Sequence, residues 1–228
     1  NLGCSGSMSR PEVIVGFGSL LSEASARTTF PNLVDFRLVR VRNFRRVFQH
    51  PAAIFFERGI AKLETQEFCS LSTEPADGAS FIAAAFRPQA ENLSMEEFHK
   101  REEEFELIDV EFEGLEGGTG TGLMCTQSTD EQYIARWGED LYQSKYKAAG
   151  LDRIWGWPWD SGIRPCPVYL RHCVLAVSKP GVVPAARDSF LDETFLADRV
   201  TTVRQYLEEH PEVMATPPPE SLASRYSG

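Results

Sequence analysis

The sequence lacks the long apolar run of a membrane-spanning helix. No stretch approaches the roughly 18 apolar residues that such a helix needs, and the start of the chain lacks the apolar segment of a signal peptide. Gly6-Ser7-Met8 resembles a cloning scar before a start at Met8, so we expect residues 1–11 to be a tag or a disordered N-terminus. These absences predict a cytoplasmic protein with no membrane partner.

Closely spaced pairs of metal ligands are also absent. The sequence contains no CxxC motif, and its four histidines are scattered, whereas structural zinc sites usually take their ligands in pairs. An odd number of cysteines without paired spacing indicates free thiols in a reducing compartment. The cysteines are Cys4, Cys69, Cys125, Cys166 and Cys173. We therefore predict no metal site and no disulfide framework.

Positive charge is in short supply. Lysine and arginine number 23 against 33 aspartates and glutamates, which gives a formal net charge of -10. Such a surface repels phosphate backbones, so we expect no nucleic-acid partner. Five arginines between residues 37 and 46 alternate with apolar residues, which is typical of the solvated face of a strand.

Apolar patterning predicts short strands in the first half of the chain, because alternating or β-branched runs recur between turn residues. The strands are expected at 13–15, 36–48 with a break near Asn43, 53–56, 59–63, 81–86, 107–112 and 123–126. One helix interrupts them. Ser94 can cap this helix, with Glu97 at the capping-box position, and the helix is expected to end near Glu104.

The second half of the chain changes to helical spacing. Helices are predicted at 130–149 and 190–207, whereas 168–177 fits either a helix or a strand. Trp155, Trp157 and Trp159 form an aromatic loop, interpreted as a core lid or, alternatively, as a wall over an active site. We predict a core at 12–126, a helical extension at 127–216 packed on that core, and a flexible tail at 217–228.

A glycine-containing loop, Gly16-Phe17-Gly18-Ser19-Leu20, follows the first strand. Two glycines around one residue let the backbone turn sharply and expose N–H groups, which can bind an anion or an oxyanion. A dinucleotide-binding fingerprint is a competing interpretation, but Leu21 stands where its third glycine is needed and the βαβ alternation is missing. A plain tight turn is a further alternative.

Three carboxylates, Glu102, Glu103 and Glu104, stand at the expected end of the helix. Successive helical residues diverge by about 100°, so at most one of the three is expected to point inward. A helix C-terminus disfavours negative charge and raises the pKa of a carboxyl there, and burial raises it further. An inward carboxylate would suit a general base, whereas outward carboxylates would form a solvated charged face.

The order of these features resembles the γ-glutamylcyclotransferase-like family, including its ChaC-type branch. The residues that carry the resemblance are GFGSL after the first strand, the run from Asn43 to Phe48 (NFRRVF), and Arg101-Glu102 after a helix. It covers roughly residues 12–126. The resemblance implies an α+β fold: a small mixed, partly closed β-barrel with flanking helices and a C-terminal helical extension.

By this resemblance, Gly16 to Leu20 form the substrate-binding loop and Glu102 is the catalytic acid/base, with Glu103 as its rival if the register is off by one. The implied reaction cyclises a small γ-glutamyl amide to 5-oxoproline and needs no metal or other cofactor. Phe17 and Phe105 stand where family members often have tyrosine. The loss of these hydroxyls leaves the substrate more open than the reaction.

Two other functions stay open at this point: a non-catalytic member of the same fold that binds a small molecule or a protein, and a dinucleotide-binding oxidoreductase. An inward Glu102 beside the loop would favour the enzyme, and an outward Glu102 would favour the non-catalytic protein. A pyridine nucleotide on the loop would favour the oxidoreductase. The sequence does not name the leaving group of the substrate or the oligomeric state.

Overall fold

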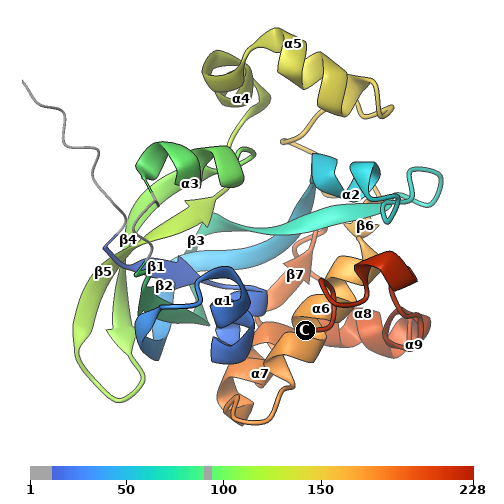
Figure 1. Ribbon diagram of the computed structural model, residues 1–228. Helices are drawn as coiled ribbons and strands as arrows, with labels where there is room; N and C mark the ends of the chain where they lie inside the picture. Colours follow the sequence, from blue (N-terminus) through green and yellow to red (C-terminus); the bar gives the residue numbers. More distant parts are fainter. Residues whose placement is uncertain (1–11, 90–93) are drawn as a thin grey trace, which may run out of the picture.

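The computed structural model describes residues 12–89 and 94–228, so the expected tag at 1–11 lies outside the described residues. Five strands close into a ring in the order β3, β1, β5, β4 and β2, and β2 pairs with β3 to complete it (Figure 1). β1 lies antiparallel to β3 and parallel to β5, so the barrel is mixed, as predicted. It is closed rather than partly closed. The strand bounds are β1 Ile14–Gly16, β2 Val34–Pro51, β3 Glu67–Arg87, β4 Glu106–Gly114 and β5 Thr119–Thr126.

β2 and β3 are long strands that pair along nearly their whole length. The break expected near Asn43 is a bulge within one continuous strand. Asn43 has a positive φ of 59°, and the register shifts between Arg42 and Phe44. Its side-chain Oδ1 accepts a hydrogen bond from the N–H of Gly78 at 3.1 Å. A bulge of this kind increases the twist of a strand and helps a sheet to curl into a barrel.

Side chains fill the barrel interior, which is therefore a packed core and not a channel. Small residues on β3 face bulky ones across the ring, so layers of different size fit together. The buried interior residues are Val15, Val39, Val41, Phe81, Ala83, Ala85, Val110, Phe112 and Met124.

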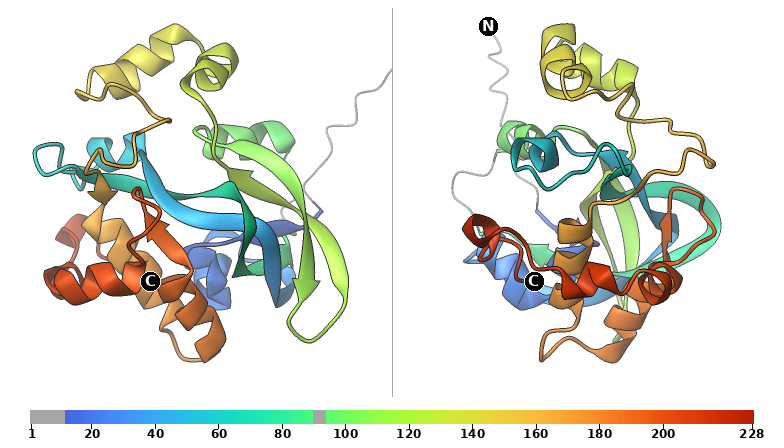
Figure 2. Two further views of the ribbon diagram at one scale, coloured as in Figure 1. Left: turned by 180° about the vertical axis from the view of Figure 1, so that it is seen from behind. Right: turned by 90° about the vertical axis from the view of Figure 1, so that its right-hand side faces the viewer.

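Helices lie at two sides of the barrel (Figures 1 and 2). Ser22 caps the N-terminus of α1 (Glu23–Thr29), and the predicted capping box of Ser94 and Glu97 stands at the start of α3 (Met95–Arg101). A segment of α4, α5 and the π-turn η2 stands beyond one end of the barrel, while α6 to α9 pack at the other side (Figure 2). The remaining bounds are α4 Asp130–Trp137, α5 Glu139–Tyr142, η2 Gln143–Lys147, α6 Pro167–Val177, α7 Pro184–Asp192, α8 Val203–Glu209 and α9 Glu212–Ala215.

Residues 127–216 were expected to be helical, but they also supply two strands to the sheet. β6 (Arg164–Pro165) runs parallel to the start of β3, and β7 (Thr194–Leu196) runs parallel to the end of β2. Both strands cover edges that the barrel ring leaves open, which satisfies backbone groups there. The predicted helix at 130–149 is interrupted at Gly138, whose φ is +93°.

The strands expected at 53–56 and 59–63 are wrong. Residues Ala53–Glu57 form α2, and between this helix and β3 there is a single bridge from Lys62 to Glu67. β2 and β3 already pair up to Pro51 and Cys69, so a strand here would lack a free edge. The helical turn instead satisfies its backbone groups internally: the N–H of Arg58 donates to the carbonyl of Ile54.

The continuous helix expected at 190–207 is also wrong. α7 ends at Asp192, and the chain then pairs with β2 as β7 before α8 begins. The Asp198 carboxylate accepts hydrogen bonds from the N–H groups of Val200 and Thr201 at 2.9 Å. These bonds stabilise the turn between β7 and α8. The apolar stripe of the sequence is therefore shared by three elements. The ambiguous segment 168–177 lies in α6.

Residues 217–228 were expected to be an extended tail, but they fold back on the protein. They include a short 3₁₀ turn, η3 (Glu220–Leu222), and Tyr226 is only 4% exposed. The ring of Tyr226 packs in a small apolar cluster with Ala52, Phe55 and Ile60. Burial of an aromatic side chain provides a stabilising contact that the proline-rich composition does not reveal.

Within the residues described, none of the helices has both the length and the apolar character that a membrane crossing demands.

Gly122 on β5 is packed so closely by its neighbours that no side chain fits at this position. A Cβ atom added there would lie 2.8 Å from the Cγ2 of Val15 and 3.0 Å from the Cγ1 of Val13. We expect Gly122→Ala to lower the free energy of unfolding by about 1–3 kcal/mol through overpacking. Thr121→Ala, at the exposed neighbouring position, should cost about 0.5 kcal/mol. Urea denaturation of both variants is the measurement, and equal stabilities would contradict this packing.

Candidate active site

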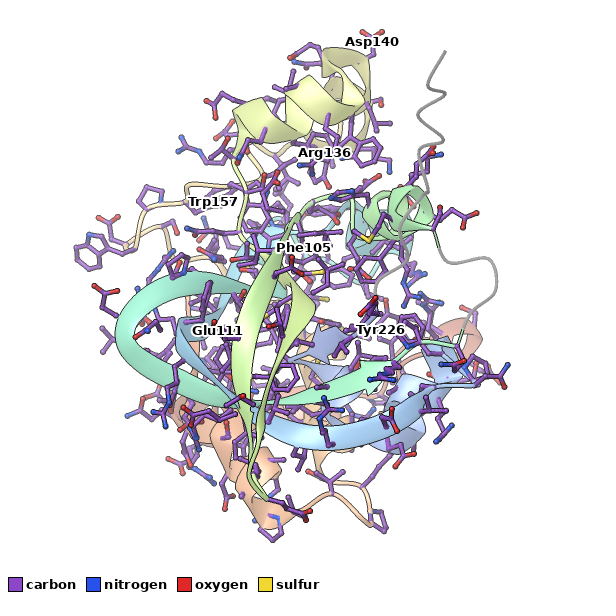
Figure 3. The ribbon with its side chains drawn as sticks, turned by 90° about the vertical axis from the view of Figure 1, so that its left-hand side faces the viewer. Phe105, Glu111, Arg136, Asp140, Trp157 and Tyr226 are labelled. Carbon is purple, nitrogen blue, oxygen red and sulfur yellow. The ribbon has the colours of Figure 1, made fainter. Side chains whose placement is uncertain are left out.

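A cavity of about 780 Å³ lies where β1 ends and the turn after α3 begins. All five loop residues from Gly16 to Leu20 line it, and so does Glu102. The structure thus brings together the site residues that the sequence singled out. α2, α6 and the segment 224–228 complete the wall. Tyr226, labelled in Figure 3, belongs to that last segment.

The three carboxylates sit in a turn and not on the helix. α3 ends at Arg101, Glu102 is its C-cap, and the N–H of Phe105 donates to the carbonyl of Glu102 at 3.0 Å. The 100° spacing of a helix therefore does not apply, and all three residues line the cavity. The expectation that at most one points inward rested on helical spacing, which does not hold in a turn. We call residues 102–105 the acidic turn.

Glu102 keeps a carboxylate that is accessible from the cavity. Its side chain is 26% exposed, and one oxygen lies 3.3 Å from the Nε of Arg101. Burial raises the pKa of Glu102 above its ordinary value, and the positive charge of Arg101 opposes that rise. A carboxyl with a raised pKa can exchange a proton more readily near neutral pH.

Glu103 and Glu104 are held by groups from the opposite side. The Nζ of Lys145 lies 2.6 Å from Glu103. The hydroxyl of Tyr146 donates to Glu104 at 2.8 Å. Glu104 is 9% exposed, and burial raises its pKa to about 7, with Glu103 and Glu102 adding to the rise. Sequence reasoning did not single out Glu104 as a second carboxyl of raised pKa, because its partner Tyr146 is 42 residues away in the sequence.

The loop is shaped by contacts that need glycine. A Cβ on Gly16 would lie 2.6 Å from the Cβ of Leu20, so the chain can turn back on itself only without a side chain there. Ser19–Leu21 form a single 3₁₀ turn, η1. Among residues 12–89 and 94–228, no hydrogen-bond acceptor meets the N–H groups of Phe17, Gly18 and Leu20. These donors lie on a segment that lines the cavity.

A phenol lies beneath the loop. A Cβ built on Gly18 would be 3.6 Å from the hydroxyl of Tyr169, which is carried by α6 and also lines the cavity. Burial raises the pKa of Tyr169 well above its ordinary value, and Cys173 and Glu102 contribute to the rise. The cavity therefore has a hydroxyl although Phe17 and Phe105 lack one. Tyr169 lies in a segment that fitted either a helix or a strand, so no pattern in the sequence pointed to it.

The buried guanidinium of Arg46 holds the loop from behind. Its Nη1 donates to the carbonyls of Phe17 and Ile82, both at 3.3 Å, and its Nη2 donates to the carbonyl of Ser189 at 2.5 Å. Burial lowers its pKa to about 9, while the negative charge of Glu193 opposes that shift. Arg46 is fully buried. The sequence had placed it on a solvated strand face, and that interpretation is wrong for this residue.

The three tryptophans have different surroundings. Trp155 is 5% exposed and stacks on His50 with ring centroids 4.2 Å apart. Trp157 packs against Phe68, whereas Trp159 is 71% exposed. Trp155 and Trp157 therefore act as a core lid, and none of the three belongs to the cavity wall.

The topology does not fit a dinucleotide site. A Rossmann unit places its first two strands in parallel in one sheet, but β1 neighbours β3 and β5 and not β2. Among the residues that the structure describes, no group of three histidine, cysteine, aspartate or glutamate side chains could hold a metal ion. The cavity is lined both by a carboxyl of raised pKa and by a loop whose N–H groups have no acceptor among the described residues.

Removal of the Arg46 guanidinium should destabilise the protein. Arg46→Met leaves the carbonyls of Phe17 and Ile82 without this donor, whereas that of Ser189 keeps the N–H of Glu193. Each unsatisfied buried acceptor costs about 1–3 kcal/mol. We expect a loss of about 3 kcal/mol or more in the free energy of unfolding, measured by urea denaturation. The control is Arg42→Met, which breaks an exposed pair with Glu113 and should cost about 1 kcal/mol or less. Similar losses in both variants would rule out the supporting role of Arg46.

Glu104 should make stability depend on pH. Because its pKa in the folded protein is about 7, against an ordinary 4.5, the folded state binds more protons than the unfolded state between these values. The free energy of unfolding should therefore fall, by up to about 3 kcal/mol, as pH rises from 4.5 to 7. Glu104→Gln should remove this fall, and Glu111→Gln, at an exposed position of β4, should keep it. A pH series of urea melts would decide, and an unchanged slope in Glu104→Gln would contradict the assignment.

No protein-family model matches the sequence, and no curated protein matches it. Solved structures resemble it in fold. An uncharacterized human protein is 13% identical, with 90% of this chain and 99% of that chain covered and a TM-score of 0.50. A gamma-glutamyl cyclotransferase is 12% identical, with 92% and 89% covered and a TM-score of 0.47. A yeast gamma-glutamyl cyclotransferase specific to glutathione is 13% identical, with 91% and 96% covered and a TM-score of 0.44. At these identities the likeness concerns the fold alone, and the predicted α+β fold with its mixed barrel is confirmed.

Proposed function

We propose that this protein is an enzyme that cyclises a γ-glutamyl amide to 5-oxoproline and releases an amine or amino acid. The observation that carries the proposal is the position of Glu102, whose raised-pKa carboxyl lines the same cavity as the loop Gly16–Leu20. The sequence had named this arrangement as the one that favours an enzyme over a non-catalytic protein. The dinucleotide alternative lacks the sheet topology that it requires.

Proton transfer begins the proposed reaction. The α-ammonium of the substrate must lose a proton before its nitrogen can attack, and the carboxylate of Glu102 takes that proton. The freed nitrogen then forms a bond to the γ-carbonyl carbon of the same molecule. The result is a five-membered ring with a tetrahedral carbon, a negatively charged oxygen and a ring nitrogen that still carries two protons.

The loop stabilises this oxygen. The N–H groups of Phe17, Gly18 and Leu20 lie on the cavity-lining loop without an acceptor among the described residues, so they can donate to the oxyanion as it forms. Arg46 binds the carbonyl of Phe17 from the opposite side and keeps the loop in place. Tyr169, 3.6 Å from the Cβ position of Gly18, adds a hydroxyl at the same end of the cavity.

Collapse of the tetrahedral carbon completes the reaction. The bond to the leaving nitrogen breaks as Glu102 returns its proton to that nitrogen. The ring nitrogen loses its second proton to water, the released amine takes up a proton in turn, and 5-oxoproline and the amine leave. The nucleophile and the carbonyl belong to one molecule, and well-oriented intramolecular reactions of this kind reach effective molarities of about 10⁵–10⁸ M. The main tasks of the protein are therefore to hold the substrate in a bent shape and to move one proton.

Loss of the Glu102 carboxylate tests the proposal. We expect Glu102→Gln to fold normally and to lose about 10²–10⁴-fold in turnover, which is the usual contribution of one general acid/base. The measurement is mass-spectrometric detection of 5-oxoproline from a panel of γ-glutamyl peptides and γ-glutamylamines.

Glu103→Gln is the matched control, because Glu103 lines the same cavity but its carboxylate is paired with Lys145. This variant should stay within about tenfold of the wild type. Turnover by Glu102→Gln at the wild-type rate would remove Glu102 from the mechanism. Wild-type protein that binds γ-glutamyl compounds without releasing 5-oxoproline would support the non-catalytic alternative instead.

A further inference from the structure

The acidic turn is held by one neighbouring segment of the chain. Three successive carbonyls of the turn accept hydrogen bonds from residues 130–155. The Nε1 of Trp137 donates to the carbonyl of Glu103 at 2.9 Å, and the Nε1 of Trp155 donates to that of Glu104 at 2.9 Å. The Nη1 of Arg136 donates to the carbonyl of Phe105 at 3.0 Å. Arg136 stands above Phe105 in Figure 3.

The same segment also binds the side chains of the turn. Lys145 pairs with Glu103, and the hydroxyl of Tyr146 donates to Glu104. Glu102 is treated differently, because its only charged neighbour within salt-bridge distance among the described residues is Arg101, on its own helix. The segment therefore fixes the backbone and two carboxylates of the turn but leaves the carboxylate of Glu102 open to the cavity.

The segment is itself a closed unit. The carboxylate of Asp130, at its start, accepts hydrogen bonds from the N–H groups of Ile154 and Trp155 at its end, the latter at 2.8 Å. The hydroxyl of Tyr142, in the middle, also donates to Asp130 at 2.7 Å. These bonds join the two ends of the segment, so the donors on Trp137 and Trp155 are held at fixed positions relative to each other.

The acidic turn needs such support for two physical reasons. The carbonyls of Glu103, Glu104 and Phe105 lie between the end of α3 and the start of β4, where, among the residues described, neither the helix nor the sheet supplies a backbone donor to them. Three adjacent carboxylates also repel one another in a partly buried site, which favours a turn that opens toward water. An outward movement of the turn would carry Glu102 away from the loop, and a displacement of about 1 Å can cost 10²-fold in rate.

We propose that residues 130–155 form a clamp that sets the position of Glu102, with Trp137, Trp155 and Arg136 as positioning residues that act through the backbone of the acidic turn. This inference rests on the proposed function of Glu102 as the proton carrier. It gives the C-terminal extension, which lies outside residues 12–126 of the family resemblance, an indirect part in the reaction. None of the three residues lines the cavity itself, so none is a catalytic residue.

Replacement of tryptophan by phenylalanine separates the hydrogen bond from the bulk of the ring. Trp137→Phe and Trp155→Phe each remove one donor to the turn and keep an aromatic ring in place. Trp157→Phe is the matched control, because the Nε1 of Trp157 donates to the carbonyl of Ile154, outside the turn, at 3.1 Å. Trp137 is only partly buried, so its variant guards against failure of Trp155→Phe to fold.

The clamp predicts a specific kinetic result. The kcat for 5-oxoproline release should fall by about 10- to 100-fold in Trp137→Phe and in Trp155→Phe, whereas KM should change less than about twofold. Trp157→Phe should match the wild type. Each kcat is calculated per folded protein, with the folded fraction measured by circular dichroism, so that a loss of folded protein is not counted as a fall in kcat. Wild-type kcat in both turn variants, or an equal fall in the control, would overturn the clamp.

A readout without substrate keeps this inference separate from the proposed function. The pKa of Glu102 can be followed by NMR of its carboxyl carbon in the wild type and the three variants. Because burial raises this pKa, a turn that opens toward water should bring it down in Trp137→Phe and Trp155→Phe, but not in Trp157→Phe. If the wild type releases no 5-oxoproline, the proposed function fails and this titration still decides the clamp. An unchanged pKa in both turn variants would refute it.

Discussion

Arg46 carries a charge into the interior of the protein, and its surroundings must offset the cost of removing that charge from water. Carbonyls of Phe17, Ile82 and Ser189 surround the guanidinium, and the rings of Phe81 and Phe190 lie 4.9 and 5.3 Å from its centre. These groups come from the loop, from β3 and from α7. One side chain thus joins the barrel, the site and the C-terminal helices, and the fold of each is constrained by the others.

The cavity has two walls that are fixed by opposite kinds of hydrogen bonding. Behind the loop, a cation donates to backbone carbonyls, which leaves backbone N–H groups of the loop for the cavity. Behind the acidic turn, indole and guanidinium groups donate to carbonyls, which leaves one carboxylate for the cavity. In both places the polar groups that face away from the cavity are satisfied by side chains from distant parts of the chain, so those that face it can stay open to a small molecule.

Local signals in the sequence predicted local structure well. The capping box of Ser94 and Glu97 and the interruption near Asn43 both depend on neighbouring residues, and both were confirmed. The mixed barrel was implied by the family resemblance, which rests on the order of the motifs. The helix at Ala53–Glu57 was missed because it depends on which edges of β2 are already paired, and this is a property of the whole sheet.

The candidate site was predictable in part for the same reason. The loop and Glu102 belong to short continuous motifs, so the sequence could name them as candidates. Tyr169 and Trp137 are positioned by contacts across more than thirty residues, and nothing in their own neighbourhoods indicated a role. Glu104 was named only as one of three adjacent carboxylates, because its partner Tyr146 is distant in the sequence. Arg46 was visible as part of an arginine-rich strand, but alternation alone cannot tell a buried arginine from an exposed one.

The length of β2 and β3 has a mechanical consequence for the whole molecule. Val39, Val41 and Phe81 on these strands lie in the barrel core, while Phe48 and Leu71, further along the same two strands, lie in the core shared with the C-terminal helices. The two cores therefore share the strands β2 and β3. Neither core can unfold alone without disrupting the pairing of these two strands. The chain should therefore unfold as a single cooperative unit. A fragment cut after residue 126 would expose to water the parts of β2 and β3 that pack against the C-terminal helices.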